Sequence, residues 1–199
     1  TCEASADYVI KSLGKSPKKI LMLGIGPLNY SRDLLAIGLR QRLGKNFIDY
    51  PRINHLYDGD SFTYTRSIDD IGVDRSSLKS KIREHYFDAI IIGSIDFKSK
   101  TALSKVPFWR IIRKHYKSDS LCFIFGGDQP PICKEHQKRL LGYLTHGTCF
   151  IRELTEKNDS VKHLEWQEYQ QVCRENWASN IEKSEQLSAT KKPYQQYLL

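Results

Sequence analysis

The sequence has no Cys-x-x-Cys pair, no long apolar run and no Gly-Lys-Ser/Thr phosphate motif. Its five cysteines are scattered singly, so the spacing indicates neither a disulfide framework nor a metal site. No apolar stretch approaches the ~20 residues that a membrane-spanning helix needs. The first residues have neither the basic nor the apolar segment of a signal peptide. We therefore expect a cytoplasmic location and no membrane span, and the residues identify no cofactor.

Positive charge is in excess, with a formal net charge of +8 over 199 residues. The basic residues are spread thinly along the chain, which is typical of a mildly basic, solvated surface. A positive surface favours anionic ligands such as sugar phosphates or nucleotides. Nucleic acid is the less favoured partner on this interpretation. The main basic residues are Lys98, Lys100, Lys105, Arg110, Arg113, Lys114, Lys134, Lys138 and Arg139.

The stretch 18–30 predicts a buried strand, a glycine turn and the start of a helix. The apolar run 20–23 does not alternate with polar residues, which is typical of a strand covered on both faces. Gly24 and Gly26 allow a sharp turn, and Asn29 or Ser31 can cap a helix over about 31–43. A free helix N-terminus after such a turn favours an anion. The third glycine of the dinucleotide fingerprint is absent, so an ordinary strand–helix turn is the alternative.

Further apolar runs near 89–94 and 121–125, and shorter ones near 46–50 and 148–151, predict four more strands. Helices are expected before the first strand, near 6–13, and between the strands, near 75–86 (capped by Asp74), 107–116 and 134–144. The alternation predicts an α/β fold, a three-layer Rossmann-like sandwich with a five-stranded parallel sheet. We expect the strand order 2-1-3-4-5, with 3-2-1-4-5 as the alternative. Residues 1–155 would form this domain, and 156–199 a helical extension that offers a surface to a protein partner.

Polar residues follow the predicted central strands, at the edge where open α/β sheets place functional groups. Asp96 and Asp128 are candidate catalytic carboxylates, although capping or bracing a turn is the alternative role of both. His55, in the irregular stretch 52–73, is a further candidate base, although a lone histidine in a loop is more often incidental. The remaining candidate ligand contacts are Gly24, Gly26, Asn29, Ser31, Ser94, Gly126, Gly127, Tyr57 and Tyr64. The two tyrosines can stack on a sugar or base, or can simply pin the loop to the domain.

Several short phrases form a pattern when taken together. They are Phe47-Ile48-Asp49-Tyr50-Pro51, His55-Leu56-Tyr57, Phe62-Thr63-Tyr64, Tyr86 to Ile95, Phe125 to Pro130 and Phe150 to Leu154. This set resembles the N-terminal domain of glycosyltransferase-like proteins related to the spore-maturation CgeB group, over residues 18–155. The resemblance implies a Rossmann-like domain that binds a sugar or sugar nucleotide.

Two features depart from that family. Gly127 stands where the family often has an acidic residue, and residues 156–199 leave no room for the second Rossmann domain, which makes most nucleotide-sugar contacts in such transferases. Two functions therefore stay open. One is an enzyme, or half of one, that acts on a sugar or sugar nucleotide. The other is a non-catalytic α/β module that binds a ligand or a protein partner.

Overall fold

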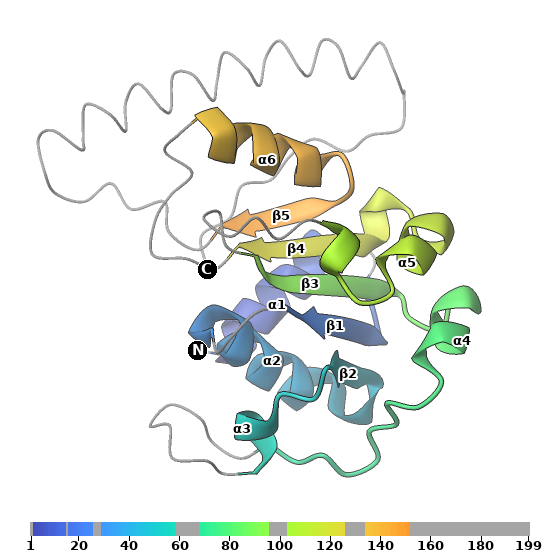
Figure 1. The fold of residues 1–199 in the computed structure, drawn as a ribbon. Coiled ribbons are helices and arrows are strands. Elements are labelled where there is room, and N and C mark those ends of the chain that lie inside the picture. Colours follow the sequence, from blue (N-terminus) through green and yellow to red (C-terminus); the bar gives the residue numbers. More distant parts are fainter. Residues whose placement is uncertain are drawn as a thin grey trace, which may run out of the picture.

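Five parallel strands form one sheet in the order β2-β1-β3-β4-β5 (Figure 1). The structure is a computed structural model that describes residues 2–14, 16–25, 29–58, 68–95, 103–125 and 134–151. The strands are β1 (Ile20–Gly24), β2 (Phe47–Tyr50), β3 (Ala89–Ile95), β4 (Leu121–Phe125) and β5 (Thr148–Ile151). The expected parallel sheet and its order 2-1-3-4-5 are confirmed, and the alternative order 3-2-1-4-5 is wrong.

Helices cover both faces of this sheet, because the side chains of each strand point alternately to the two sides. In β1, Ile20 and Met22 join the core beneath α1 (Cys2–Ser12) and α2 (Tyr30–Leu43). Leu21 and Leu23 join the core beneath α4 (Leu78–Arg83), α5 (Trp109–His115) and α6 (Lys134–Leu144). The fold is therefore the three-layer sandwich that the sequence predicts.

Short helical elements fill several connections. They are α3 (Asn54–Tyr57) and the 3₁₀ turns Gly44–Asn46, Leu103–Lys105 and Ser118–Ser120. The predicted helix over 75–86 is shorter than expected, and its predicted cap is wrong. Asp74 instead accepts hydrogen bonds from Ser76 N and Lys81 Nζ, while Ser77, in the left-handed region, precedes the helix.

The described cysteines and helices agree with two of the sequence-based expectations. Cys2, Cys122 and Cys149 are unpaired, and burial raises the pKa of the Cys122 and Cys149 thiols. Among the residues that the structure describes, no helix has the length and apolar character needed to cross a membrane. The expected extension 156–199 lies outside the described residues.

Gly38 marks the place where α1 packs against α2. A Cβ atom on Gly38 would lie 2.0 Å from the Cys2 carbonyl oxygen and 3.0 Å from Ala6 Cβ. No side chain fits at that distance, so the glycine lets the two helices approach closely. Gly142 in α6 offers a contrast, since a Cβ atom there would meet nothing within 4 Å.

We predict that Gly38→Ala and Gly142→Ala change stability in opposite directions. The methyl group of Gly38→Ala collides with α1, and we expect a loss of about 1–3 kcal/mol in the free energy of unfolding. Gly142→Ala removes backbone freedom from the unfolded chain without a clash, and a gain of about 0.4–1 kcal/mol is expected. Urea unfolding of both variants measures the difference. Two shifts of the same sign would contradict the close packing of α1 on α2.

Candidate functional site

The sheet changes direction of winding at β1, and this puts the switch point of the strand order at the carboxyl ends of β1 and β3. The connection through α2 carries the chain from β1 to β2 on one side, whereas β3 lies on the other side of β1. Ligands of open α/β sheets bind at such a reversal. β1 ends at Gly24 and β3 at Ile95, next to Ser94. Ile25 N donates to Gly93 O at 2.9 Å. Both Gly24 and Ser94 were predicted there.

The first turn of α2 begins at this edge. Asn29 has extended backbone angles (φ −145°, ψ 115°), and its side-chain oxygen accepts a hydrogen bond from Arg32 N at 3.1 Å. Asn29 O accepts from Asp33 N at 3.0 Å, which starts the helical ladder. Asn29 is therefore the N-cap, and the alternative that Ser31 caps the helix is wrong. The first N–H groups of a helix and its dipole together favour an anion at this end.

Ser31 and Arg32 are both buried in this first turn. Ser31 is 8% exposed, and within the part of the chain that the structure describes its hydroxyl has no hydrogen-bond partner. The guanidinium of Arg32 pairs with Asp33 Oδ1, with Nε and Nη2 each at 2.9 Å. Its Nη1 lies 3.7 Å from the place where a Cβ atom on Gly24 would stand. A positive group therefore lies directly against the end of β1.

Asp33 joins this turn to His55 on α3. The Asp33 side chain is fully buried, and its second oxygen, Oδ2, lies 2.8 Å from His55 Nε2. Because Asp33 also pairs with Arg32, its carboxylate accepts from the ring and His55 Nε2 carries the proton. The imidazole is thereby held in one orientation. His55 is 15% exposed in its side chain, so it lies at the border between core and solvent.

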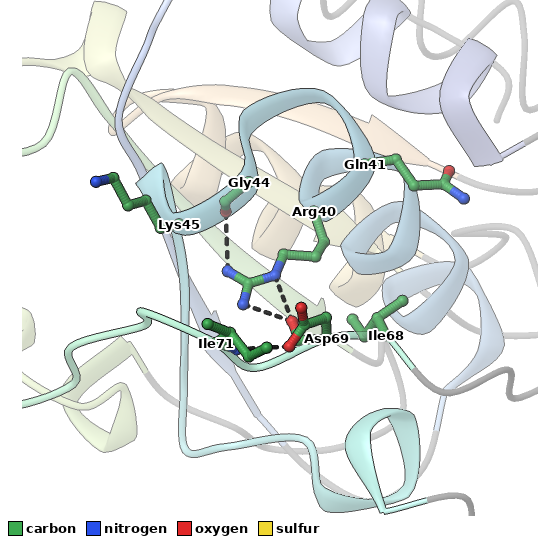
Figure 2. Close-up of a pocket in the computed structure, with 7 residues that line it drawn as sticks. All are labelled: Arg40, Gln41, Gly44, Lys45, Ile68, Asp69 and Ile71. Carbon is green, nitrogen blue, oxygen red and sulfur yellow. Dashed lines mark hydrogen bonds between the residues drawn. The ribbon is translucent and has the colours of Figure 1, made fainter.

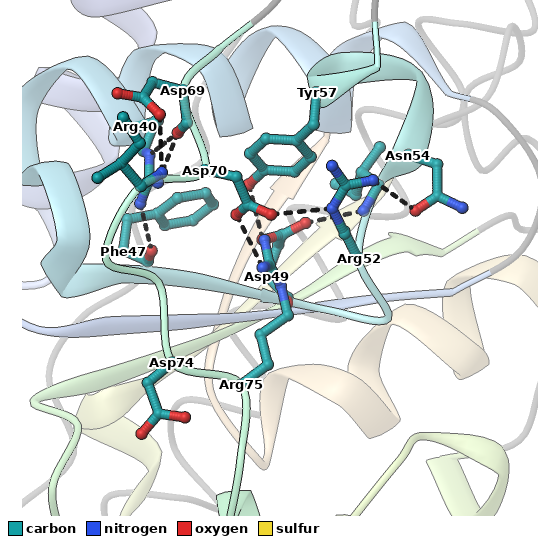
Figure 3. A network of polar contacts seen from close by, with 12 residues as sticks. Arg40, Phe47, Asp49, Arg52, Asn54, Tyr57, Asp69, Asp70, Asp74 and Arg75 are labelled. Carbon is teal, nitrogen blue, oxygen red and sulfur yellow. Dashed lines mark hydrogen bonds and ion pairs between the residues drawn. The ribbon is translucent and has the colours of Figure 1, made fainter.

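A network of charged residues fixes α3 and the segment 68–75 to β2 (Figure 3). Its centre is the carboxylate of Asp49, which is 1% exposed. Oδ2 of Asp49 accepts from Ile53 N at 2.8 Å, and Oδ1 accepts from the Tyr57 hydroxyl at 2.7 Å and from Arg75 Nη2. The start of α3 is therefore held on both sides of His55.

The arginines of this network extend it to the surface. Arg75 Nη1 lies 2.8 Å from one oxygen of Asp70, and Arg52 Nε donates to the other at 2.9 Å. Arg52 also forms a two-pronged pair with Asp58, with both distances 2.7 Å. Burial alone would raise the pKa of Asp70, but the bonds to Arg52 and Arg75 outweigh it and lower the pKa. The stability that the ionised Asp70 contributes is present above a pH of about 4 and is lost as the pH falls below that value.

The predicted ligand contact Tyr57 belongs to the same network. The guanidinium carbons of Arg52 and Arg75 lie 4.7 and 5.1 Å from the centre of its ring. Burial, the charge of Asp49 and the hydrogen bond to it raise the pKa of Tyr57. Its ring and its hydroxyl are thus both engaged by protein groups.

A separate cavity of about 270 Å³ lies at the other end of α2 (Figure 2). Arg40 is at its centre and donates to the backbone carbonyls of Asp69, Gly44 and Phe47. Its guanidinium is occupied in holding the segment near Asp69 against α2 and β2. Because α2 runs antiparallel to the strands, this cavity lies at the edge opposite the predicted crevice. Its other lining residues are Gln41, Lys45, Ile68 and Ile71.

The structure brings part of the predicted site together. Gly24, Asn29 and Ser31 lie around the first turn of α2, and Asp33 links that turn to His55. Gly26, Tyr64, Asp96, Gly126, Gly127 and Asp128 lie outside the described residues. Among the described residues, no group of three or more metal-ligating side chains could hold an ion.

Sequence reasoning missed Arg32 and Asp33, although one signal could have found Asp33. It lies at helical spacing with Ala36, Ile37 and Arg40, all of which are buried. A charged residue on the buried face of a helix indicates a buried ion pair.

Comparison with known proteins finds no matching family model, no matching curated protein and no matching solved structure.

We predict that Arg75 contributes strongly to stability. Replacing it by Met keeps most of its volume but leaves the buried Asp49 carboxylate without its counter-ion, and we expect a loss of about 3–5 kcal/mol in the free energy of unfolding. Arg42→Met is the matched control, because Arg42 pairs with Asp7 at 2.6 Å on the surface. Its unfolding should stay close to that of the wild type. Equal urea midpoints for the two variants would show that the Asp49 network does not stabilise the fold.

Proposed function

We propose that this domain binds a sugar nucleotide, or another phosphorylated sugar, at the carboxyl edge of its sheet, as a glycosyltransferase-like module. The observation that carries the proposal is the reversal of strand order at β1, with the N-terminus of α2 at the same point. A crevice at that place is where open α/β sheets bind ligands. The resemblance to glycosyltransferase-like proteins supports the same ligand class.

The phosphate end of the ligand fits the first turn of α2. The 14-residue helix directs its dipole and its first N–H groups to this edge. Gly24 leaves the end of β1 without a side chain, so a ligand can approach the backbone. Arg32 adds a buried positive charge, although its pairing with Asp33 offsets part of it.

The sugar end requires groups that handle hydroxyls, and the pair Asp33–His55 supplies one. A histidine oriented by a buried carboxylate can take the proton of an attacking hydroxyl during transfer. In this role His55 would be the base, and Asp33 would position its ring.

The alternative is a non-catalytic binding module, and one observation favours it. Asp33 is engaged by both Arg32 and His55, and the His55 side chain is 15% exposed. These contacts can also serve only to hold α3 against α2. The two candidates differ in whether bound sugar nucleotide is turned over.

We predict that Asn29→Asp weakens the binding of a phosphorylated ligand while the domain stays as stable as the wild type. Aspartate caps helices as well as asparagine does, so the helix start is kept. Its negative charge at the anion site should lower the affinity about tenfold or more, as measured by calorimetry with a panel of nucleotide sugars.

Asn29→Ser is the matched control, because serine also caps the helix but adds no charge. Its affinity should equal that of the wild type. If the wild type binds no member of the panel, the proposal fails. If Asn29→Asp binds a nucleotide sugar as tightly as Asn29→Ser does, the phosphate does not lie at the start of α2.

His55→Gln separates the two candidate functions. The glutamine amide can still donate to Asp33 but cannot take up a proton. If His55 is the base, turnover of the bound sugar nucleotide should fall by about 10²–10⁴-fold, with the affinity within a few-fold of the wild type. Binding without turnover in the wild type would identify a non-catalytic module, and unchanged turnover in the variant would show that His55 has a structural role.

A further inference from the structure

Exposed basic residues lie on α4 and α5 and in the segments that flank them. These two helices pack against each other on one face of the sheet (Figure 1). The buried side chains of these helices, Leu78 and Ile82 on α4 and Trp109 and Ile112 on α5, point into the core. The basic residues alternate with them at helical spacing and therefore face solvent. The exposed basic residues of this surface are Lys79, Arg83, Lys105, Arg110, Arg113, Lys114 and Lys117.

Little negative charge offsets this basic α4–α5 surface. Within the described part of the chain, none of its seven basic side chains forms an ion pair or hydrogen bond, in contrast to Lys81, which pairs with Asp74 at 2.6 Å. The carboxylates nearest in sequence are Glu84, Asp88 and Asp119. Asp88 already accepts hydrogen bonds from the backbone N–H groups of Lys18 and Lys19, at 2.8 and 2.9 Å. The surface therefore has a positive potential that a polyanion would neutralise.

We propose that the α4–α5 surface binds the phosphate backbone of a single-stranded nucleic acid. The sequence argued against nucleic acid because the basic residues are spread along the chain, but the fold places the seven described ones of this surface on two neighbouring helices and the segments that flank them. Lysine and arginine side chains that track a phosphate backbone supply affinity without reading sequence.

The apolar content of this surface disfavours a protein partner or a membrane. Among the described residues the large exposed apolar side chains are Tyr30, Ile71 and Tyr86, and only Tyr86 adjoins α4. Protein interfaces contain an apolar core, and a helix lying on a membrane inserts an apolar face. The apolar faces of α4 and α5 are instead buried in the core of this domain.

Aromatic rings at the ends of these helices favour a single strand over a duplex. His85 follows α4, and its ring centre lies 5.8 Å from that of His115 at the end of α5. Tyr86, next to His85, is 37% exposed, although the ammonium groups of Lys19 and Lys81 lie 4.1 and 5.7 Å from the centre of its ring. The unpaired bases of a single strand can stack on such rings beside a basic surface, whereas the bases of a duplex are stacked on one another.

The test is fluorescence anisotropy with a labelled single strand of about 20 nucleotides, long enough for the site sizes of single-strand binders. We expect binding to the wild type to weaken linearly with the logarithm of salt concentration. The double variant R110A/K114A removes two neighbouring charges of the surface. If both contact phosphates, the slope should become shallower by about 1.4, at about 0.7 per contact.

The double variant K11A/K45A is the matched control, since it removes the same charge from exposed lysines on α1 and after α2, on the other side of the sheet. Its slope should equal that of the wild type. The proposal is overturned if the wild type does not bind the single strand at low salt, or if both double variants weaken binding equally. Binding to a duplex of the same length at least as tight as to the single strand would overturn the assignment to single strands.

Discussion

The fold depends on one constraint, the burial of both faces of a parallel sheet. Strands β1, β3 and β4 have apolar side chains on both sides, so each face needs its own layer of helices. Short connections and right-handed crossovers then fix how the chain can place those layers. The reversal of winding at β1 follows from covering both faces, and it brings the strand ends and the start of α2 to one edge. The candidate ligand site is thus a consequence of how the core is covered.

Apolar runs made the sheet predictable from the sequence. The unalternated runs of β1, β3 and β4 identified the central strands, and the more polar β2 was assigned correctly to an edge. Helix ends were less well predicted, because a few local contacts decide them. Around α4, the carboxylate of Asp74 bonds Ser76 N and Lys81 instead of capping the helix, and the helix begins only at Leu78.

The partners of the buried charges were the part that the sequence could not predict. Asp33, Asp49 and Arg40 belong to residue types that usually lie at the surface, and each has a partner far along the chain. His55 is 22 residues from Asp33, and Arg75 is 26 residues from Asp49. A buried charge is tolerated only when such partners converge on it, and convergence is a property of the folded chain. His55 could be singled out as a titratable group in a loop, but the carboxylate that orients it could not.

The arginines around β2 have a consequence for how this sheet meets other chains. The carbonyls of Phe47 and Asp49, two residues apart and so on the same side of the strand, accept hydrogen bonds from Arg40 and Arg75. A foreign strand seeking to extend the sheet there would find those acceptors occupied by guanidinium groups. Edge strands whose backbone groups stay unpaired are the usual starting points of domain swapping and fibre growth. Because arginine side chains occupy these acceptors of β2, association with another sheet through this edge strand is disfavoured, although the strand contains no proline or bulge.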